Sequence, residues 1–233
     1  LPENKLLQEN KAEEISLSTE VNYINKEEIQ YFLKTNPFPI YSFDYETIMH
    51  GIPAYNKSRP YQQIPFQYSL HYQKDAASKP EHFEFLGNGV DDPREGLIQS
   101  MIANFAHEGS ILVYSISFER TRIKELIRDF PKYGDELENI QGRLVDLLPL
   151  FRHHIKTEAT TKSASLKIVL PTFLPHLSYD ELDIQNGMAT MEAYRNLNTL
   201  SEIEIVKAKE NMLEYCKLDT LAVLKLYELL YSY

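Results

Sequence analysis

The stretch Ile40–Thr47 constrains the fold of this chain more than any other segment. Aromatic and β-branched residues dominate the stretch and prolines precede it, which is typical of a buried strand. It contains two acids, Asp44 and Glu46. Because side chains alternate along a strand, both carboxylates point to the same face. Two neighbouring buried carboxylates are costly unless a cation lies near them, so the stretch predicts the floor of a divalent-metal site.

The apolar pattern of the rest of the chain predicts an α/β domain with a mixed sheet. A continuous apolar run at 111–114 favours a buried parallel strand. Ser201 and Glu204 form a capping box, which predicts the start of a long last helix. The expected elements are strands at about 39–46, 64–72, 82–86 and 111–114, helices at about 26–34, 93–109, 118–130 and 201–231, a strand or helix at 144–148, a helix stop at Gly109, and a helical turn at 165–170 closed by Pro171.

The N-terminal part differs in character from the rest. Residues 1–22 are polar and lack periodicity, so we expect a tail or linker with some helix near Leu6. Asn25, followed by a lysine and two acids, is typical of a helix start. We therefore expect residues 1–37 to form an N-terminal linker and short helix, and residues 38–233 to form one domain. The chain begins with Leu, which we interpret as the start of a fragment of a longer protein.

The net charge of the chain limits the classes of function that it can have. The net charge of −10 argues against a general nucleic-acid coat, which needs a basic face. The segment 115–171 holds ten Lys or Arg against eight Asp or Glu, so its net charge is +2 and that of the remainder is −12. This segment can hold a polyanion locally, or its charges can be those of ordinary solvated helices. The sequence leaves both interpretations open.

Other bulk features bear on location. No apolar run approaches the roughly 20 residues that a membrane helix needs, and the polar start does not resemble a signal peptide. The single cysteine, Cys216, excludes an internal disulfide framework and a cysteine-rich zinc site. We therefore expect a cytoplasmic protein that does not associate with a membrane.

Acidic residues recur at three places that can meet in a folded domain. The first is the pair Asp44 and Glu46. The second is Glu119, shortly after the apolar run at 111–114. The third is Asp219, which follows Tyr215 by four residues in the last predicted helix, so the two side chains lie on one helix face.

In this order, the three signals resemble the motif set of the DEDDy 3′–5′ exonucleases, which have the RNase H-like fold. Several blocks also resemble a bacterial domain of unknown function that is often found C-terminal to a RecB-like nuclease region. The resemblance covers about residues 38–231, and single motifs within it are weak. The blocks that carry it are Phe43–Thr47, Ser165–Lys167 with Leu170–Pro171, Leu177–Tyr179 and Tyr215–Thr220.

The resemblance implies an RNase H-like mixed sheet of about five strands, with an antiparallel hairpin and parallel strands flanked by helices. It implies two Mg²⁺ or Mn²⁺ ions and phosphodiester hydrolysis at single-stranded DNA or RNA 3′ ends, in a chain with a possible upstream nuclease region as partner. The implied metal ligands are Asp44, Glu46, Glu119 and Asp219, and Tyr215 is implied to position the attacking water. Exonucleases of this kind usually have Asp at the position of Glu119, and Ser115 stands where an Asn is often found.

Two other functions stay open at this stage. The first is a catalytically weak or inactive exonuclease-like domain that binds nucleic acid or a protein, which Glu119 and the negative charge favour. The second is a non-nuclease adaptor within a larger machine. Several polar residues have simpler structural interpretations: Asp146 as a structural acid, Ser165 as a helix cap, Lys167 as a solvated lysine, Cys216 as a small buried residue, and His153, His154 and His176 as non-ligands.

Overall fold

The computed structural model describes residues 21–233, so the helix expected near Leu6 lies outside the described residues. The strands are β1 Val21–Ile24, β2 Ile40–Met49, β3 Gln63–Gln73, β4 Glu81–Leu86, β5 Ser110–Val113, β6 Leu144–Asp146 and β7 Ile155–Thr157. The helices are α2 Lys26–Thr35, α3 Arg94–Asn104, α4 Ser117–Asp129, α5 Gly134–Gly142, α6 Leu166–Phe173, α7 Gly187–Asn196 and α8 Glu202–Leu229. Short 3₁₀ turns cover Pro131–Tyr133, Leu197–Thr199 and Leu230–Ser232, and a π-helical turn covers Leu150–His154.

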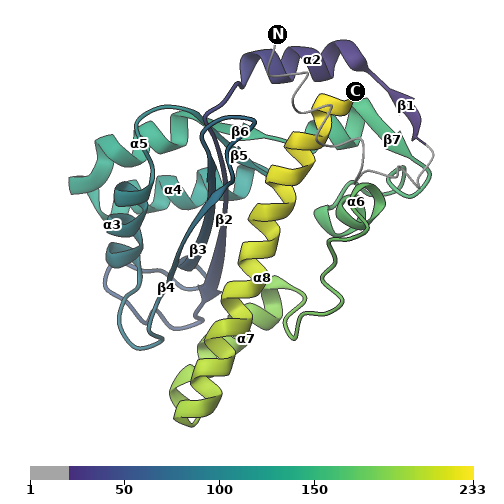
Figure 1. The fold of residues 1–233 in the computed structure, drawn as a ribbon. Helices are drawn as coiled ribbons and strands as arrows, with labels where there is room; N and C mark the ends of the chain where they lie inside the picture. The colour runs from purple at the N-terminus through teal and green to yellow at the C-terminus, as the bar shows by residue number, and fades with distance from the viewer. Residues whose placement is uncertain (1–20) are drawn as a thin grey trace.

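The predicted mixed sheet is confirmed, with five strands in the order β4-β3-β2-β5-β6 (Figure 1). The strands β2, β3 and β4 form an antiparallel meander, whereas β5 and β6 add in parallel beside β2. The apolar run at 144–148, which was open between strand and helix, is a short strand that ends at Asp146. The acidic strand β2 is therefore central, with a neighbour on each side.

A β-bulge lies directly beside the second acid of β2. Glu46 pairs with Gln67, whereas the next residue, Thr47, pairs with Pro65, so Phe66 is the extra residue of β3. Proline has no N–H for the ladder, and a bulge is one of the few places where a strand accepts it. Bulges redirect side chains near functional sites, and this one changes which residues of β3 face α8 on either side of Glu46.

The two faces of the sheet are covered by different helices, and β2 alternates between them. Tyr41, Phe43 and Tyr45 pack into the apolar layer under α3, α4 and α5. Ile40 and Ile48 belong to the other layer, which lies under α8. Figure 1 shows α8 crossing one face of the sheet along its whole length. No helix within residues 21–233 is long and apolar enough to span a membrane.

The long last helix follows the prediction closely. It runs unbroken over 28 residues, and the capping box of Ser201 and Glu204 is present. Its C-terminal half is buried, because Leu224 and Tyr227 pack into the same apolar layer as the residues of α6. The helix is therefore a fixed reference against which β2 is positioned.

Two predicted helix ends are wrong. The third helix ends at Asn104, where the Phe105 N–H bonds to Met101 O, and not at Gly109. Gly109 instead lies directly before β5 with a φ of +90°. A glycine is needed there, because an added Cβ would lie only 2.6 Å from Pro39 O. Pro171 lies inside α6 and does not close it, because a short helix loses only one hydrogen bond there.

The segment before β2 packs against the rest of the molecule. β1 pairs antiparallel with β7 in a small second sheet that the sequence did not predict. Asn25 caps α2 by accepting a hydrogen bond from the Glu28 N–H, as predicted, and Ile29 of this helix is fully buried. The domain boundary after residue 37 stays a prediction.

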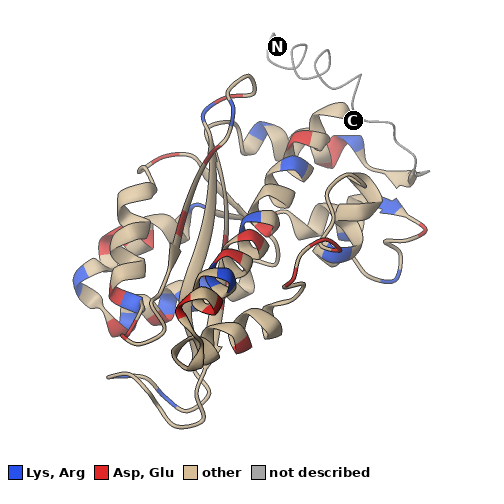
Figure 2. Ribbon diagram, turned by 60° about the horizontal axis from the view of Figure 1, so that its bottom comes forward, with Lys and Arg blue, Asp and Glu red and all other residues tan. Residues whose placement is uncertain are grey.

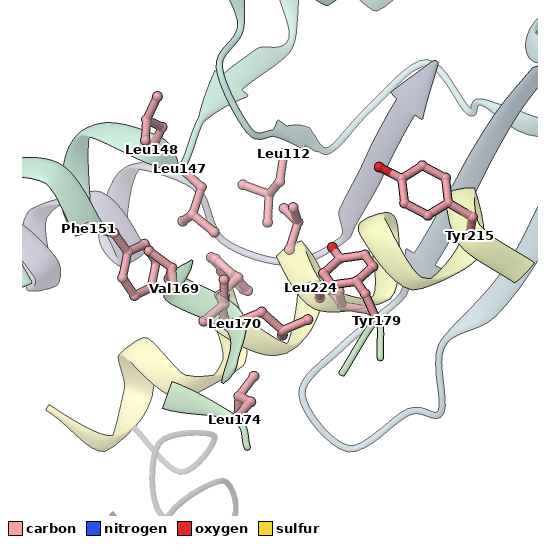
Figure 3. Close-up of a cluster of buried hydrophobic side chains, with 14 of the residues drawn as sticks. Leu112, Leu147, Leu148, Phe151, Val169, Leu170, Leu174, Tyr179, Tyr215 and Leu224 are labelled. Atoms are coloured by element: carbon pink, nitrogen blue, oxygen red, sulfur yellow. The ribbon is translucent and has the colours of Figure 1, made fainter. Parts of the chain in front are cut away.

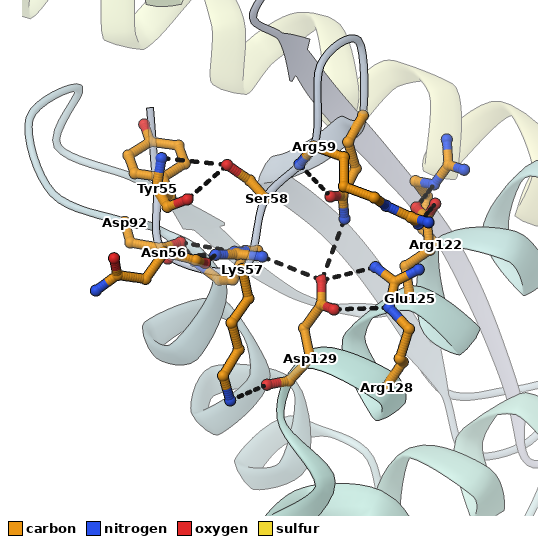
Figure 4. A network of polar contacts seen from close by, with 12 residues as sticks. Tyr55, Asn56, Lys57, Ser58, Arg59, Asp92, Arg122, Glu125, Arg128 and Asp129 are labelled. Carbon is orange, nitrogen blue, oxygen red and sulfur yellow. Dashed lines mark hydrogen bonds and ion pairs between the residues drawn. The ribbon is translucent and has the colours of Figure 1, made fainter. Parts of the chain in front are cut away.

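A network of polar contacts that includes Asp92 and Asp129 holds the loop that leaves β2 (Figure 4). Arg94 is 1% exposed and donates to the carboxylates of Asp92 and Asp129 at 2.7 and 3.1 Å and to Asn56 O at 2.6 Å. Asp129 also accepts a hydrogen bond from Gln62 Nε2 at 3.1 Å. The middle of the 50–62 loop is thereby fixed to α3 through Asn56, and its last residue, Gln62, is fixed to the end of α4.

Candidate active site

The structure brings together all four predicted acids. Asp44 and Glu46 come from β2, Glu119 from the first turn of α4 and Asp219 from the middle of α8. Glu46, Glu119 and Asp219 are 7%, 3% and 8% exposed, while Asp44 is partly exposed. The charge of Asp44 interacts with those of the other three. These positions follow from the alternation in β2 and from the crossing of α8 over that strand.

Burial raises the pKa values of all four acids, and repulsion between acids adds to this for Asp44 and Glu46. Burial raises the pKa of Asp44 well above its usual value, and the charges of Asp219, Glu119 and Glu46 raise it further. Burial and Asp219 raise the pKa of Glu46 to about 8, against the opposing effect of Lys167. Burial likewise raises the pKa of Glu119 to about 7 and that of Asp219 to about 6. The cluster is therefore costly to ionise as it stands.

Glu119 is positioned by a strained turn that Asp146 stabilises. Ser115, between β5 and α4, has a φ of +79°, which is unusual for a residue with a Cβ. The Asp146 carboxylate accepts the N–H groups of Ser115 at 3.0 Å and Ile116 at 3.1 Å. It also accepts the Leu148 N–H at 3.0 Å, which confirms its expected structural role. Strain of this kind persists where the surroundings enforce it, here one turn before a candidate ligand.

Two tyrosines reach Asp219, and only one was predicted. Tyr215 hydrogen-bonds Asp219 from one turn earlier on α8. Tyr179, from the irregular segment after α6, donates its O–H to Asp219 Oδ1 at 2.5 Å. Their ring centroids are 5.9 Å apart, and Figure 3 shows both rings at the edge of the apolar layer. Burial raises both pKa values, so both side chains stay phenols.

A signal for Tyr179 was present in the sequence. It belongs to the block Leu177–Tyr179, which carries part of the family resemblance, although no role was assigned to it. The irregular backbone around this residue has no periodicity that would aim its side chain. Its function at the site is thus evident only from the fold.

Glu46 lies against the start of α7, a helix that the sequence did not predict. A Cβ added at Gly187, the first residue of α7, would lie 3.3 Å from Glu46 Oε2. The Asn186 side chain caps the helix by accepting the Ala189 N–H. The helix N-terminus favours a negative charge nearby, so α7 partly offsets the repulsion among the acids.

The positive charge of Lys167 acts on two of the four acids. It lowers the pKa values of Glu46 and Asp219, although larger effects raise them. Its ammonium group donates to Gln185 O at 2.6 Å and lies 5.8–5.9 Å from the ring centroids of Tyr179 and Tyr215. The side chain is exposed, as expected, and also lines the cavity beside the acids.

That cavity has a volume of about 280 Å³. Phe43 and Asp44 form its floor, with Tyr215, Asp219 and Val223 of α8 on one side. The remaining lining comes from Tyr114 and the start of α6, Ser165–Lys167. Ser165 is the N-cap residue of α6, as predicted, but its side chain makes no capping hydrogen bond.

Cys216 lies directly beneath the acids. Its ligand atom is within 4.8 Å of those of Asp44 and Glu46, and its sulfur lies 3.9 Å from Asp44 O. Burial, followed by the three nearest acids, raises the pKa of the thiol well above its usual value. A soft sulfur ligand suits Mg²⁺ or Mn²⁺ poorly, so we interpret Cys216 as a packing residue.

The donor set suits a hard divalent cation. Four carboxylates offer oxygen ligands, which Mg²⁺ and Mn²⁺ prefer. Glu119 Oε2 is buried and has no hydrogen-bond partner within residues 21–233. A buried polar atom without a partner is rare in a folded protein, and a cation beside it would satisfy it.

Comparisons with known proteins identify relatives but no activity. A family described as a domain of unknown function, DUF2779, matches residues 41–165, which is more than half of the chain. The chain is 28% identical over 204 residues to an uncharacterized MG366 homolog of Mycoplasma pneumoniae, covering 78% of this chain and 30% of that protein. It is 27% identical to uncharacterized protein UU173 of Ureaplasma parvum, covering 84% of this chain and 31% of that protein. No solved structure matches the chain.

Proposed function

The chain belongs to the DUF2779 family, and from that premise and its acidic cluster we propose that it is a metal-dependent 3′–5′ exonuclease domain with an RNase H-like architecture. It spans about a third of the length of the curated relatives it matches, 30–31%. The printed names of those relatives assign no activity. The activity, the single-stranded substrate and an upstream nuclease region as partner are therefore all proposals.

One observation carries this proposal. Four carboxylates from three elements meet at one place. Burial raises the pKa of each of them, and the charges of neighbouring acids raise the pKa values of Asp44 and Glu46 further. Folding does not gather such groups for stability, because each charge loses hydration and gains a repulsive neighbour. A divalent cation would convert the repulsion into attraction. Perturbed acids beside a cavity are also the usual mark of a catalytic site.

The residues of the chain divide into three roles. Asp44, Glu46, Glu119 and Asp219 would hold the ions. Bound Mg²⁺ or Mn²⁺ would supply the positive charge that stabilises the attacking and leaving oxygens of a phosphodiester.

The tyrosines and Lys167 would act on water and phosphate. Tyr215 and Tyr179 are neutral hydrogen-bond donors, so they orient water and Asp219 and do not remove a proton themselves. Lys167 borders the same cavity and can pair with a phosphate oxygen that enters it.

Mn²⁺ titration by calorimetry tests the metal site. We expect binding by the wild type with a dissociation constant in the millimolar range or tighter, and its loss in Asp44→Asn. Glu138→Gln, an exposed acid on α5, is the matched control and should bind as the wild type does. A wild type that binds no Mn²⁺ at millimolar concentrations contradicts the proposal.

Digestion of end-labelled single strands tests the reaction. We expect shortening from the 3′ end in Mg²⁺ or Mn²⁺, none with Asp44→Asn, and none when the 3′ hydroxyl of the strand is blocked. Equal hydrolysis by the wild type and Asp44→Asn would place the activity elsewhere. Hydrolysis of a 3′-blocked strand would indicate an endonuclease.

One feature favours a second function, a domain that binds nucleic acid without cutting it. Glu119 carries one methylene more than the aspartate usual in such exonucleases, which moves its carboxylate by about 1.5 Å. A binding module would hold single strands without metal, and Asp44→Ala would bind them as well as the wild type. Metal-dependent hydrolysis rules this alternative out.

A further inference from the structure

A second, larger cavity adjoins the one beside the acids. Its volume is about 590 Å³, within the range of about 300–1,000 Å³ that is common for ligand sites. The two cavities share three lining residues, Tyr114, Ser165 and Leu166. A ligand lying over these residues would touch the acids at one end and the larger cavity at the other.

The larger cavity is lined by cations and hydroxyl groups. Among residues 21–233, its lining includes no carboxylate, in contrast to its acidic neighbour. Arg152 and Lys162 are exposed, and neither is ion-paired with any residue of the described part of the chain. The hydroxyl groups belong to Ser115, Thr160, Thr161, Ser163 and Ser165.

The walls of this cavity are held by internal hydrogen bonds. Thr160 is 5% exposed and its hydroxyl accepts the Thr157 N–H at 2.9 Å. Thr161 donates to Thr157 O at 2.8 Å, which closes the turn after β7. Tyr114 donates to Ala164 O at 2.7 Å and ties this turn to the end of β5. These bonds fix the turn that carries Lys162.

The negative net charge of the molecule distinguishes this cavity from the rest of the surface as a site for a polyanion. Figure 2 shows charges of both signs interspersed along the helices and loops. The net charge of −10 would repel a polyanion from most of the surface. This cavity has two cations without an ion-pair partner, and no acid in its lining, within the described part of the chain, so a polyanion would be tolerated there.

We propose that this cavity binds the sugar–phosphate backbone of a single strand, on the 5′ side of the linkage that the acids cleave. Arg152 and Lys162 pair with backbone phosphates, and the hydroxyl groups bond to sugars and phosphates. This inference rests on the proposed nuclease function. It makes the substrate an oligonucleotide, with the 3′-terminal nucleotide in the cavity of about 280 Å³ and the preceding nucleotides in the larger one.

The test compares two charge-matched double variants. Arg152→Gln/Lys162→Gln removes the proposed contacts, whereas Lys74→Gln/Lys124→Gln removes two exposed lysines that line neither cavity. Anisotropy of a 5′-fluorescein-labelled single-stranded 12-mer is measured in Ca²⁺ at several salt concentrations. Thermal unfolding by circular dichroism checks that both variants fold, and Arg152→Lys/Lys162→Arg serves as a rescue variant that keeps the charges.

We expect the cavity variant to lose at least about tenfold in affinity. Each phosphate contact on a single strand contributes about 0.7 to the slope of log affinity against log salt, so this slope should fall by about 1.4. The control variant should keep the wild-type slope, and the rescue variant should restore most of the affinity. An unchanged affinity and slope in the cavity variant would overturn the inference.

Kinetics separate this inference from the proposed function. With the p-nitrophenyl ester of thymidine 5′-monophosphate, too short to reach the larger cavity, the cavity variant should match the wild type. With the 12-mer its KM should rise about tenfold with little change in kcat. Equal losses on both substrates overturn the inference while the nuclease function stands. If the wild type binds the 12-mer through these residues but hydrolyses neither substrate, the proposed nuclease function is wrong and the binding inference stands.

A free phosphate is the other ligand that this chemistry could hold. Inorganic phosphate at 10 mM should compete only weakly with the 12-mer, because it offers one charge centre where the strand offers several. If phosphate displaced the strand completely, and did so from the wild type but not from the cavity variant, the cavity would be a phosphate site and the strand path would be wrong.

Discussion

At the scale of single residues, the candidate site depends on the hydrogen bonds that Asp219 accepts. It receives hydrogen bonds from Tyr179 and Tyr215, which come from different parts of the chain. Both bonds lower the pKa of Asp219 and partly offset the effect of burial, which raises it. The two tyrosines thus share one task, keeping Asp219 ionised, but only Tyr215 is also next to the floor of the cavity.

We predict that the two tyrosines separate in their effects. Tyr215→Phe should lower kcat on single strands by about 10²-fold, because it removes a group that orients water. It should weaken Mn²⁺ binding less than Tyr179→Phe does, because Tyr215 lowers the pKa of Asp219 by less than Tyr179 does. Tyr179→Phe should weaken Mn²⁺ binding about threefold at pH 7 by raising the pKa of Asp219, and the loss should shrink at pH 8.5. Single-turnover kinetics and calorimetry measure the two effects. Identical profiles for both variants would contradict this division.

At the scale of elements, two turns position the site from outside it. The turn between β5 and α4 carries Glu119, and the Asp146 carboxylate at the end of β6 stabilises that turn. The loop after β2 is fixed by Arg94. Each is a buried polar contact whose removal would leave other polar groups without partners.

We predict that Asp146→Ala lowers the free energy of unfolding by about 3 kcal/mol, since three backbone N–H groups lose their acceptor. Urea unfolding measures this loss. Mn²⁺ affinity should fall too, because Glu119 is no longer held. Glu138→Ala on the exposed side of α5 is the control and should change stability by less than about 0.5 kcal/mol. Equal unfolding midpoints for the two variants would refute the role of Asp146.

We predict a larger loss for Arg94→Met, about 3–5 kcal/mol, because it leaves the buried Asp129 without its buried partner. The nearby Arg128 side chain is 44% exposed and also pairs with Asp129. Solvent screens an exposed pair, so Arg128→Met should cost no more than about 1 kcal/mol. Denaturant titration of both variants decides, and a smaller loss for Arg94→Met than for Arg128→Met would contradict the burial argument.

At the scale of the whole molecule, the acidic cluster makes stability depend on pH and on metal. Glu46 and Glu119 have folded pKa values of about 8 and 7, above their ordinary value of 4.5. Between the ordinary pKa of 4.5 and these folded pKa values, the folded state therefore holds more protons than the unfolded state. The stability that these two groups contribute is fully present below pH 4.5 and is lost as the pH rises through their folded pKa values.

The buried His71 and the partly buried His82 act in the opposite direction. Burial lowers the pKa of His71 to about 3 and that of His82 to about 4. Their neutral forms are favoured by the fold, so their contribution to stability is present above pH 6.5 and is lost as pH falls toward these values. Above pH 6.5 the effect of the histidines fades as the unfolded state loses their protons, and the carboxyl groups dominate the pH dependence.

We predict that in EDTA the melting temperature falls between pH 6.5 and 8.5, and that Asp44→Asn flattens this fall. Mn²⁺ should raise the melting temperature more at pH 8.5 than at pH 6.5, because only the ionised acids bind it. Differential scanning calorimetry at four pH values, with and without Mn²⁺, measures both trends. A metal-free melting temperature that rises across this window would contradict the pKa shifts.

Local patterns in the sequence determined much of the site. Alternation along a strand places Asp44 and Glu46 on one face, and a spacing of four aligns Tyr215 with Asp219 on a helix, so these pairs need no long-range information. The hairpin, the parallel strand before Glu119 and the capped last helix follow from periodicity and caps of the same local kind. The mixed sheet was therefore predictable as a class.

Only the tertiary structure decided which distant groups complete the site. Tyr179 lies in an irregular segment without periodicity, and its approach to Asp219, 40 residues later, depends on how that segment packs. The contact of α7 with Glu46 and the cavity around Arg152 and Lys162 likewise join elements far apart in sequence. Local pattern determines the direction of a side chain on its own element. Packing between elements determines what that side chain meets, because burial and sterics act through space and not along the chain.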